Sequence, residues 1–181
     1  IAVEPAAMAG LATTLRKEAA AKSLGDMENP AQPFGLKLEL LGGKTSFGLG
    51  EDIAFIVESD RDGYLTLVDL GTDGTVSMLL PNADDPSMRV QASQRLEYPG
   101  EVVGGNLSFV ALEPVGGGMV RAFVTAEPLD LTIPPGKLYA AGGEAFAMEI
   151  AEALKKAAGS EGEAVRLDSW GSASVVYEIT N

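Results

Sequence analysis

Two aspartates in one turn are the first candidates for chemistry in this chain of 181 residues. Asp60, Asp62 and Gly63 form the pattern Asp-x-Asp-Gly, which opens some calcium-binding loops because carboxylates at alternating positions supply hard oxygen ligands. The complete loop pattern also needs an acidic residue near its end, where this chain has Gly71. An Asp-Gly turn between two strands requires the same residue types for backbone reasons. The pattern favours such a turn, with a metal site at Asp60 and Asp62 as the alternative.

Asp69 and Asp73 suggest a second possibility, since they follow Asp60 and Asp62 closely along the chain. If the four carboxylates gather at one end of a hairpin, two of them could act as general acid and base, as in glycoside hydrolysis. Aspartates at the tips of turns are more commonly just solvated. A carboxylate-based glycan hydrolase is therefore an alternative to a protein without catalysis.

The chain contains no histidine and no cysteine. Without cysteine there is no disulfide framework, no thiolate nucleophile and no zinc-thiolate site. Without histidine there is no imidazole base, and neither a Ser-His-Asp nor a Cys-His arrangement can form. We therefore expect a protein that is not an enzyme and that carries no cofactor.

The charge and hydropathy of the chain limit its partners. Asp and Glu number 26 against 13 Lys and Arg, which gives a net charge of −13. Nucleic acids and anionic bilayers are bound by clustered Lys and Arg, so we expect neither as a partner. No apolar run approaches the roughly 18 residues that a membrane span requires, so we expect no membrane insertion by this segment.

Aromatic residues are the remaining candidates for recognition, and Tyr64 and Trp170 are the two that we single out. Aromatic side chains at strand positions usually belong to the core, but Trp170 lies between Ser169 and Gly171, so we expect it to be partly exposed. The run Gly116 to Gly118 predicts a flexible segment. It is followed by no Lys-Ser/Thr pair, so it is not a phosphate loop.

Two helices and many short strands are expected to position these residues. Apolar residues at spacings of three and four predict helices over residues 5–24 and 143–158. Pro30 and Pro33 predict a linker that ends near residue 35. Alternation of apolar and polar residues predicts strands, and the Asp73-Gly74 turn predicts a hairpin. The expected strands lie at residues 36–40, 53–57, 64–70, 75–81, 90–98, 106–112, 119–126, 129–133 and 172–180. Those at residues 106–112 and 119–126 are expected to pair with each other.

This pattern predicts a mostly β protein, an Ig-like antiparallel β-sandwich with an N-terminal helix and one further helix. We expect two parts, a helix and linker over residues 1–35 and a β-sandwich accessory domain over residues 36–181. The helix either packs on the sandwich or connects it to another domain. The chain begins with Ile1 rather than Met, so we expect a trimmed piece of a longer protein.

A series of short motifs in order resembles a known bacterial family. Gly63-Tyr64-Leu65, Val68-Asp69-Leu70, Gly74 and Leu80-Pro81-Asn82 occur between residues 48 and 82. RVQASQRLEYPG, FVALEPVGGGMVRAFVTAEPL and WGSASVVYEIT follow. Over residues 36–181 the chain resembles the family known as domain of unknown function 4384.

The resemblance implies an architecture more than an activity. Such domains are β-sandwich accessory domains without an assigned activity, found on the C-terminal side of caspase-like peptidases, protein kinases and envelope-associated proteins. It implies a non-catalytic accessory or binding module that mediates protein or ligand interaction, with an upstream catalytic domain or another protein as partner. It favours the bacterial envelope or periplasm over the cytoplasm, and a calcium-stabilised envelope module that uses Asp60 and Asp62 is the alternative.

Overall fold

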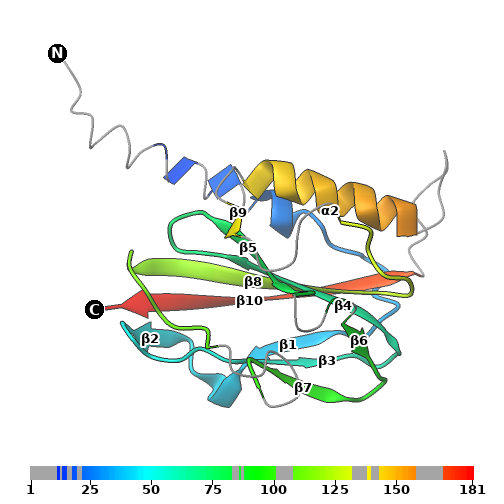
Figure 1. Ribbon diagram of the computed structural model, residues 1–181, viewed down its shortest axis with the longest axis horizontal. Helices are drawn as coiled ribbons and strands as arrows, with labels where there is room; N and C mark the ends of the chain where they lie inside the picture. The colour runs from blue at the N-terminus through cyan, green and yellow to red at the C-terminus, as the bar shows by residue number, and fades with distance from the viewer. Residues whose placement is uncertain are drawn as a thin grey trace.

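Two β-sheets and a covering helix make up the computed structural model of this protein (Figure 1). The structure describes residues 22–82, 86, 88–100, 108–131, 138–139, 143–157 and 169–181, together with Ala12, Thr14, Leu15, Glu18 and Ala19. Within these residues the protein is mostly β, and the expected β-sandwich is confirmed.

The smaller sheet has three antiparallel strands in the order β1-β3-β7 among the described residues. Its strands are β1 (Lys37–Leu40), β3 (Phe55–Glu58) and β7 (Arg95–Tyr98). A short 3-10 turn, η1 (Leu41–Gly43), follows β1. Alternating side chains of β1 and β7 point into the molecule, because a strand turns successive residues to opposite faces.

The larger sheet has the order β2-β10-β8-β4-β5-β9, with β6 paired to β4. The pairing of β2 with β10 is parallel, so this sheet is mixed at that edge. The other pairings are antiparallel in the described part of the chain. The strands are β2 (Ser46–Gly48), β4 (Gly63–Leu70), β5 (Val76–Leu80), β6 (Arg89–Val90), β8 (Gly116–Thr125), β9 (Leu138–Tyr139) and β10 (Trp170–Thr180).

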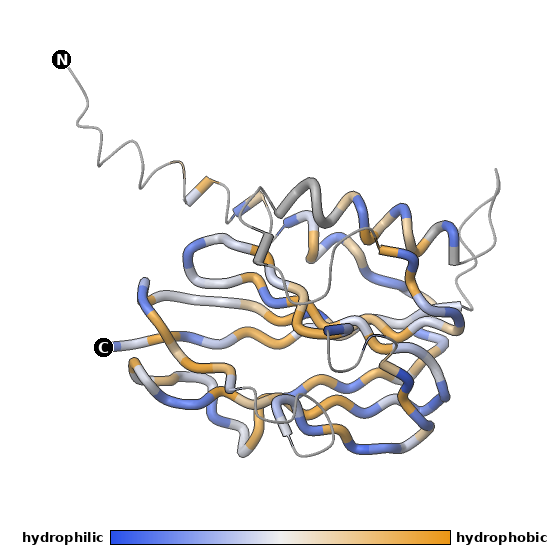
Figure 2. Tube along the Cα trace, in the orientation of Figure 1, coloured by the Kyte–Doolittle hydropathy of each residue, from blue (hydrophilic) through white to orange (hydrophobic). Residues whose placement is uncertain are grey.

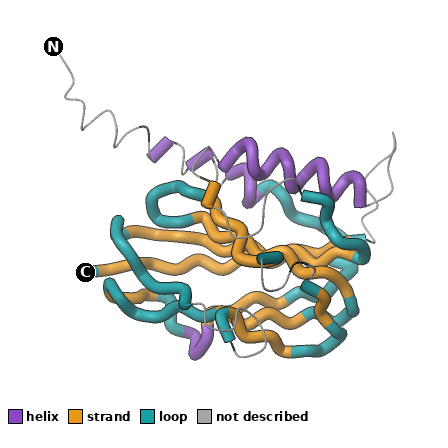
Figure 3. The backbone as a smooth tube through the Cα atoms, viewed as in Figure 1, coloured by secondary structure: helices purple, strands orange, loops and turns teal. Residues whose placement is uncertain are grey.

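The helix α2 (Gly143–Ala157) lies over the larger sheet on the side away from the smaller one, so the molecule has three layers (Figures 1 and 3). The predicted helix over residues 143–158 and the hairpin of β4 and β5 are both confirmed. None of the helices in the described ranges is long and apolar enough to cross a membrane.

Two apolar cores fill the spaces between these layers. The first lies between the sheets and includes Phe55, Leu67 and Val120, all fully buried. The second lies between the larger sheet and α2, where Ile150 and Leu154 of the helix meet Phe123 of β8. Figure 2 shows the apolar residues concentrated along the strands that line these spaces. We call the sheet face toward the smaller sheet inner and the face toward α2 outer.

The N-terminal segment is integrated with the sandwich. Of the predicted helix at residues 5–24, the described residues are helical. Leu24 is fully buried in the outer core, and Phe34 is 3% exposed in the inner core. The side-chain amide of Asn29, also fully buried, donates to the carbonyl of Trp170 at 2.5 Å. The segment from Leu24 to Phe34 therefore contributes a buried apolar side chain to each of the two cores.

The predicted strand at residues 90–98 is in fact two strands. A turn separates β6 from β7, because Ser93 has a φ of 62° and the amide of Gln91 donates to the side chain of Gln94. The amide of Gln94 also donates to the carbonyl of Gln91. These contacts close the turn that divides the segment.

Two further strand predictions are wrong. Residues 108–112 do not pair with β8, because β4 and β10 already occupy both edges of that strand, and Val110 makes only an isolated bridge to Asp52. Leu129 and Leu131 lie outside the strands and pack against the outer core. The remainder of both predicted segments, residues 106–107 and 132–133, lies outside the described residues.

Candidate functional site

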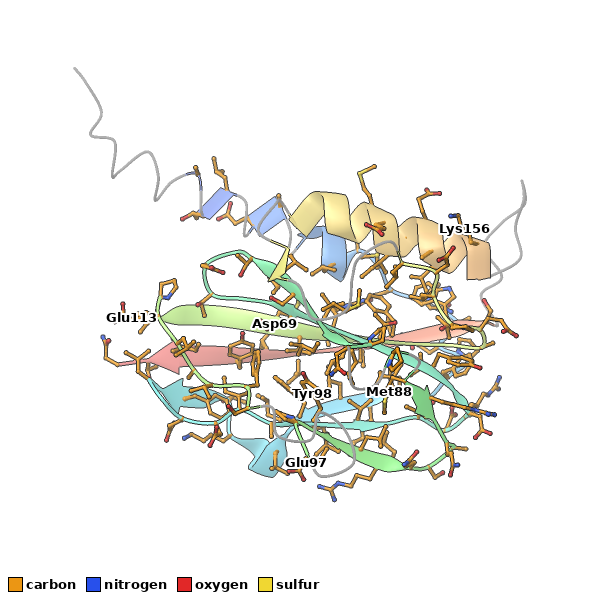
Figure 4. The ribbon with its side chains drawn as sticks, in the orientation of Figure 1. Asp69, Met88, Glu97, Tyr98, Glu113 and Lys156 are labelled. Atoms are coloured by element: carbon orange, nitrogen blue, oxygen red, sulfur yellow. The ribbon has the colours of Figure 1, made fainter. Side chains whose placement is uncertain are left out.

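A polar cavity opens at the end of the sandwich where β4 ends and β10 approaches its own end. Its volume is about 190 Å³. Asp69 of β4, Ser77 of β5 and Tyr177 of β10 line it from the larger sheet, and the segment 109–113 closes one side. Figure 4 shows Asp69 at the level of the larger sheet and Glu113 near the end of that sheet where β10 finishes. The cavity is lined by Ile53, Asp69, Gly71, Thr72, Asp73, Thr75, Ser77, Phe109, Val110, Leu112, Glu113, Tyr177 and Ile179.

Asp69 is the buried charged group of this cavity. The alternation of β4 places Leu65 and Leu67 in the inner core, and Asp69 follows on the same face. It is only 5% exposed. The hydroxyl of Tyr177 donates to Asp69 Oδ1 at 2.8 Å across the intervening strand β8. The carboxyl group is thus held in one position by a side chain 108 residues later in the chain.

Burial dominates the acid-base behaviour of this pair. Desolvation raises the pKa of Asp69 to about 7, the Tyr177 hydrogen bond lowers it, and the charge of Asp73 raises it. The pKa of Tyr177 is raised, first by burial and then by the nearby charge of Asp69. Burial also raises the pKa of Tyr98 on the opposite sheet, with a contribution from Asp69. Asp69 therefore changes its charge near neutral pH.

The turn between β4 and β5 shapes the mouth of the cavity. Asp73 Oδ1 accepts hydrogen bonds from the backbone amide and the hydroxyl of Thr75, at 2.8 and 2.6 Å. The amide of Gly71 donates to the carbonyl of Thr75, and Gly74 has a φ of 82° that favours glycine. The predicted Asp-Gly hairpin thus brings a second carboxylate to the cavity.

Gly118 provides the space that the Tyr177 ring occupies. A Cβ at residue 118 would overlap Cζ and Oη of Tyr177 and would lie 2.7 Å from Cε2. The ring can cross β8 to reach Asp69 only because residue 118 has no side chain. The segment Gly116 to Gly118, which was predicted to be flexible, forms the beginning of strand β8 and pairs with Tyr177 to Ile179.

A second hollow, the outer groove, lies on the outer face of the larger sheet. Its volume is about 500 Å³. Leu70, Met119 and Val176 supply its apolar side chains. Gly117 makes the groove deeper because it has no side chain. Val176 is 65% exposed. The groove is lined by Thr45, Leu70, Gly117, Gly118, Met119, Val176, Tyr177 and Glu178.

Asp60 and Asp62 lie at the opposite end of β4 from the cavity. A strand rises about 3.3 Å per residue, so Asp62 and Asp69 are separated by roughly 23 Å and the four aspartates do not gather at one end. Asp60 Oδ1 accepts from the amide of Gly35 at 2.7 Å, and Asp62 Oδ1 accepts from the amide of Ala92 at 2.8 Å. Each carboxylate thus fastens a different backbone segment.

The described residues hold no group of three or more acidic side chains disposed to bind a metal ion. The calcium hypothesis for Asp60 and Asp62 would therefore depend on two carboxylates that already accept backbone hydrogen bonds. It stays a prediction.

The two aromatic candidates differ in exposure. Trp170 is 7% exposed and belongs to the outer core beside Phe123, so the expectation of partial exposure is wrong. Its small neighbours Ser169 and Gly171 do not expose it, because Trp170 packs in the outer core with Leu24 and Phe123. Tyr64 is half-buried beside β6 and β8. Neither residue lines the cavity or the outer groove.

Sequence reasoning missed the pairing of Asp69 with Tyr177. A signal was present for Asp69, because a charged residue in register with Leu65 and Leu67 must face the core. A signal was also present for Tyr177, because it lies on the same face of its strand as the apolar residues Val175 and Ile179. No local pattern says that the two residues meet across β8.

Comparison with known proteins supports the resemblance found in the sequence. Residues 46–128 match the family described as domain of unknown function (DUF4384). The matched segment runs from β2 to just beyond β8, so it includes Asp69 and Gly118 but not Tyr177. The resemblance to this family is confirmed over that segment, which is shorter than the expected range of residues 36–181. Neither the curated proteins nor the solved structures gave a match.

Proposed function

We propose that this protein is a non-catalytic binding module that accommodates a segment of another polypeptide in the outer groove. The segment has an apolar face and basic flanking residues. One observation carries the proposal: a hollow of about 500 Å³ with an exposed valine lies beside the part of the sheet that α2 covers.

The groove resembles the surface beneath α2 in composition. There the sheet presents Val68, Leu70 and Phe123 to the helix, which buries them. In the groove Met119 and Val176 extend the same face, and Val176 remains 65% exposed. Burial of such apolar area is the main favourable contribution to protein association. A second apolar segment can therefore pack beside α2 on this sheet.

Charge favours a basic partner. Glu178 lies in the groove, and the chain has a net charge of −13. Complementary charge speeds encounter and disfavours acidic competitors. Lys or Arg residues on either side of the apolar face would meet this requirement. A separate protein can supply such a segment.

The absence of histidine and cysteine supports a module without catalysis. Asp69 and Asp73 share one small cavity, so a carboxylate-based hydrolase remains the alternative of a different class. However, Asp73 Oδ1 is occupied by Thr75 and Asp69 Oδ1 by Tyr177, so both carboxylates already have structural partners. An assay of glycan hydrolysis with Asp69→Asn as control addresses that alternative.

Selection from a library of random peptides tests the binding proposal. We expect the selected peptides to combine apolar and basic residues and to bind at least ~10-fold more weakly to Val176→Asp, a loss of about 1.4 kcal/mol. Met148→Asp on α2 is the matched control, because Met148 has the same 65% exposure outside the groove. If the peptides bind both variants equally, or none is selected, the groove is not a binding site.

A calcium-stabilised module that uses Asp60 and Asp62 is the remaining alternative. Thermal unfolding in calcium and in chelator distinguishes it from the proposal. An increase in melting temperature that Asp60→Asn and Asp62→Asn abolish would support the metal. Unchanged melting temperatures would leave both aspartates with the backbone roles described above.

A further inference from the structure

We propose that the cavity at the end of the sandwich binds a primary ammonium group carried on an aliphatic stem. This site lies around Asp69 on the inner face of the larger sheet. It is a different site from the outer groove. The ammonium would lie against the Asp69 carboxyl group, and the stem would lie against the apolar wall.

The polar side chains that line the cavity end in oxygen atoms among the described residues. Asp69, Asp73 and Glu113 contribute carboxylates, and Thr72, Thr75 and Ser77 contribute hydroxyl groups. None of the described lining residues is Lys or Arg. An ammonium group has three donors and no acceptor, so it matches such a lining, whereas an anion would be repelled.

Asp69 has no cationic partner in the described part of the chain. The ion pairs formed by described residues involve Lys22, Lys37, Lys44 and Arg121, and none reaches Asp69. The Tyr177 hydroxyl is the hydrogen-bond donor recorded for its carboxyl group among these residues, and it bonds to Oδ1. A carboxylate that is 95% removed from solvent and has one donor is poorly compensated, because buried charges are normally paired. A bound cation would supply the missing charge.

The opposite wall of the cavity is apolar. Ile53 and Ile179 are almost fully buried there, and the ring of Phe109 packs edge-on to Tyr177 with a centroid distance of 6.2 Å. The volume of about 190 Å³ corresponds to roughly six water-sized groups at ~30 Å³ each. A four-carbon alkylamine has five heavy atoms and therefore fits. The same group ends a lysine side chain, so a free amine and a polypeptide are the two possible sources of the ammonium.

Calorimetric titration of the full chain at pH 8 with n-butylammonium chloride tests the proposal. We expect saturable binding of the amine and no comparable binding of n-butanol, which has the same shape without the charge. N-acetyl-lysine methylamide is the second probe. Tighter binding of this probe identifies a lysine side chain as the ligand, and binding of butylamine alone identifies a free amine.

Asp69→Asn is the decisive variant. The amide preserves the shape of the side chain and removes a buried charge, and its fold can be checked by denaturation. We expect amine affinity to fall at least ~10-fold, or about 1.4 kcal/mol. Asp130→Asn removes the same charge from an exposed position outside the cavity, and it should bind as the wild type does. Absence of saturable binding to the wild type, or equal binding by folded Asp69→Asn, would overturn the proposal.

Proton release provides a second readout. The titratable groups that face Asp69 are Tyr177 from β10, Tyr98 from β7, Asp73 from the turn after β4 and Glu113 at the rim. Since the pKa of Asp69 is about 7, a cation that binds its ionised form at pH 7 should release about half a proton. Titrations in buffers of different ionisation enthalpy measure this number. Val176→Asp should bind the amine normally, so failure of the groove proposal and failure of this one are distinguishable.

Discussion

The phenol ring of Tyr177 lies across the backbone of Gly118, in a position that a side chain at residue 118 would occupy. Gly118 and Tyr177 are paired residues on adjacent strands β8 and β10. The missing side chain allows the ring to pass over β8 and its hydroxyl to reach Asp69 on β4. A glycine in one strand thus connects two polar residues in the strands on either side.

Replacement of Gly118 by Ala should destabilise the protein by about 1–3 kcal/mol, because the added methyl group overpacks the site. The Tyr177 ring would have to move away from Asp69. Gly117→Ala is the matched control, since a Cβ at residue 117 would lie 3.9 Å from its nearest neighbour. Urea denaturation measures both values, and equal stability of the two variants would contradict the close contact.

Asp69→Asn should stabilise the protein, and more so as the pH rises. The folded-state pKa of Asp69 is raised from 3.8 to about 7, so the folded state retains a proton that the unfolded state loses in this interval. The wild type therefore loses stability from this group between pH 4 and pH 7 and loses no more above it. The shift corresponds to a difference of about 4 kcal/mol at its upper limit.

Denaturation of wild type and Asp69→Asn across this pH range measures the difference, in which the contributions of all other groups cancel. A difference that is constant with pH would show that Asp69 ionises normally in the folded protein.

The segment before β1 should be necessary for stability. A fragment beginning at residue 36 lacks Leu24 and Phe34, each of which contributes about 1.5–3 kcal/mol by burial. We expect it to be less stable by several kcal/mol than a fragment beginning at residue 22. Chemical denaturation of the two fragments makes the comparison. Equal stability would mean that the sandwich is complete from β1 onward.

Arg121 should contribute far more to the free energy of unfolding than its ion-pair partner Glu28. Its guanidinium is 2% exposed and donates to the carbonyl of Met27 at 2.6 Å and to the hydroxyl of Ser172 at 3.4 Å. Arg121→Ala should cost about 3 kcal/mol, because it leaves a void and removes the shorter of the two hydrogen bonds that the carbonyl of Met27 accepts, the other coming from Ser172. Glu28 lies 3.9 Å from the guanidinium with its side chain 70% exposed, so Glu28→Gln should cost less than about 0.5 kcal/mol. Thermal or urea unfolding distinguishes the two, and a comparable loss in both variants would give the ion pair the larger role.

The elements that depend on neighbouring residues could be predicted from the sequence. The β4–β5 hairpin follows from the Asp73-Gly74 turn between alternating segments, and α2 follows from its apolar spacing. β2 has three residues and pairs in parallel with a strand more than 120 positions later, so no local pattern reveals it. The burial of Trp170 has no local signal for the same reason, because its partners in the outer core include Leu24 from the beginning of the chain.

The candidate site was only partly predictable. Asp69 and Asp73 share the cavity, but Asp60 and Asp62 lie at the other end of β4, because the eight residues of that strand separate the two pairs. The run of glycines predicted a flexible segment, since glycine is uncommon in strands. At Gly118 the requirement for glycine comes from the Tyr177 ring, and the separation of residues 118 and 177 hides that relation from any local pattern.

The position of β10 inside the larger sheet also has a consequence for synthesis. This strand lies between β2 and β8. Its residues Trp170 and Ser172 form hydrogen bonds with Asn29 and Met27 of the N-terminal segment. A nascent chain that ends before residue 170 therefore has an unpaired β2, an open edge on β8 and an uncovered Arg121. Such an intermediate presents strand edges to its neighbours while it remains on the ribosome. Completion of the fold must wait until β10 has emerged, so chaperone binding before that point should protect the open edge of β8.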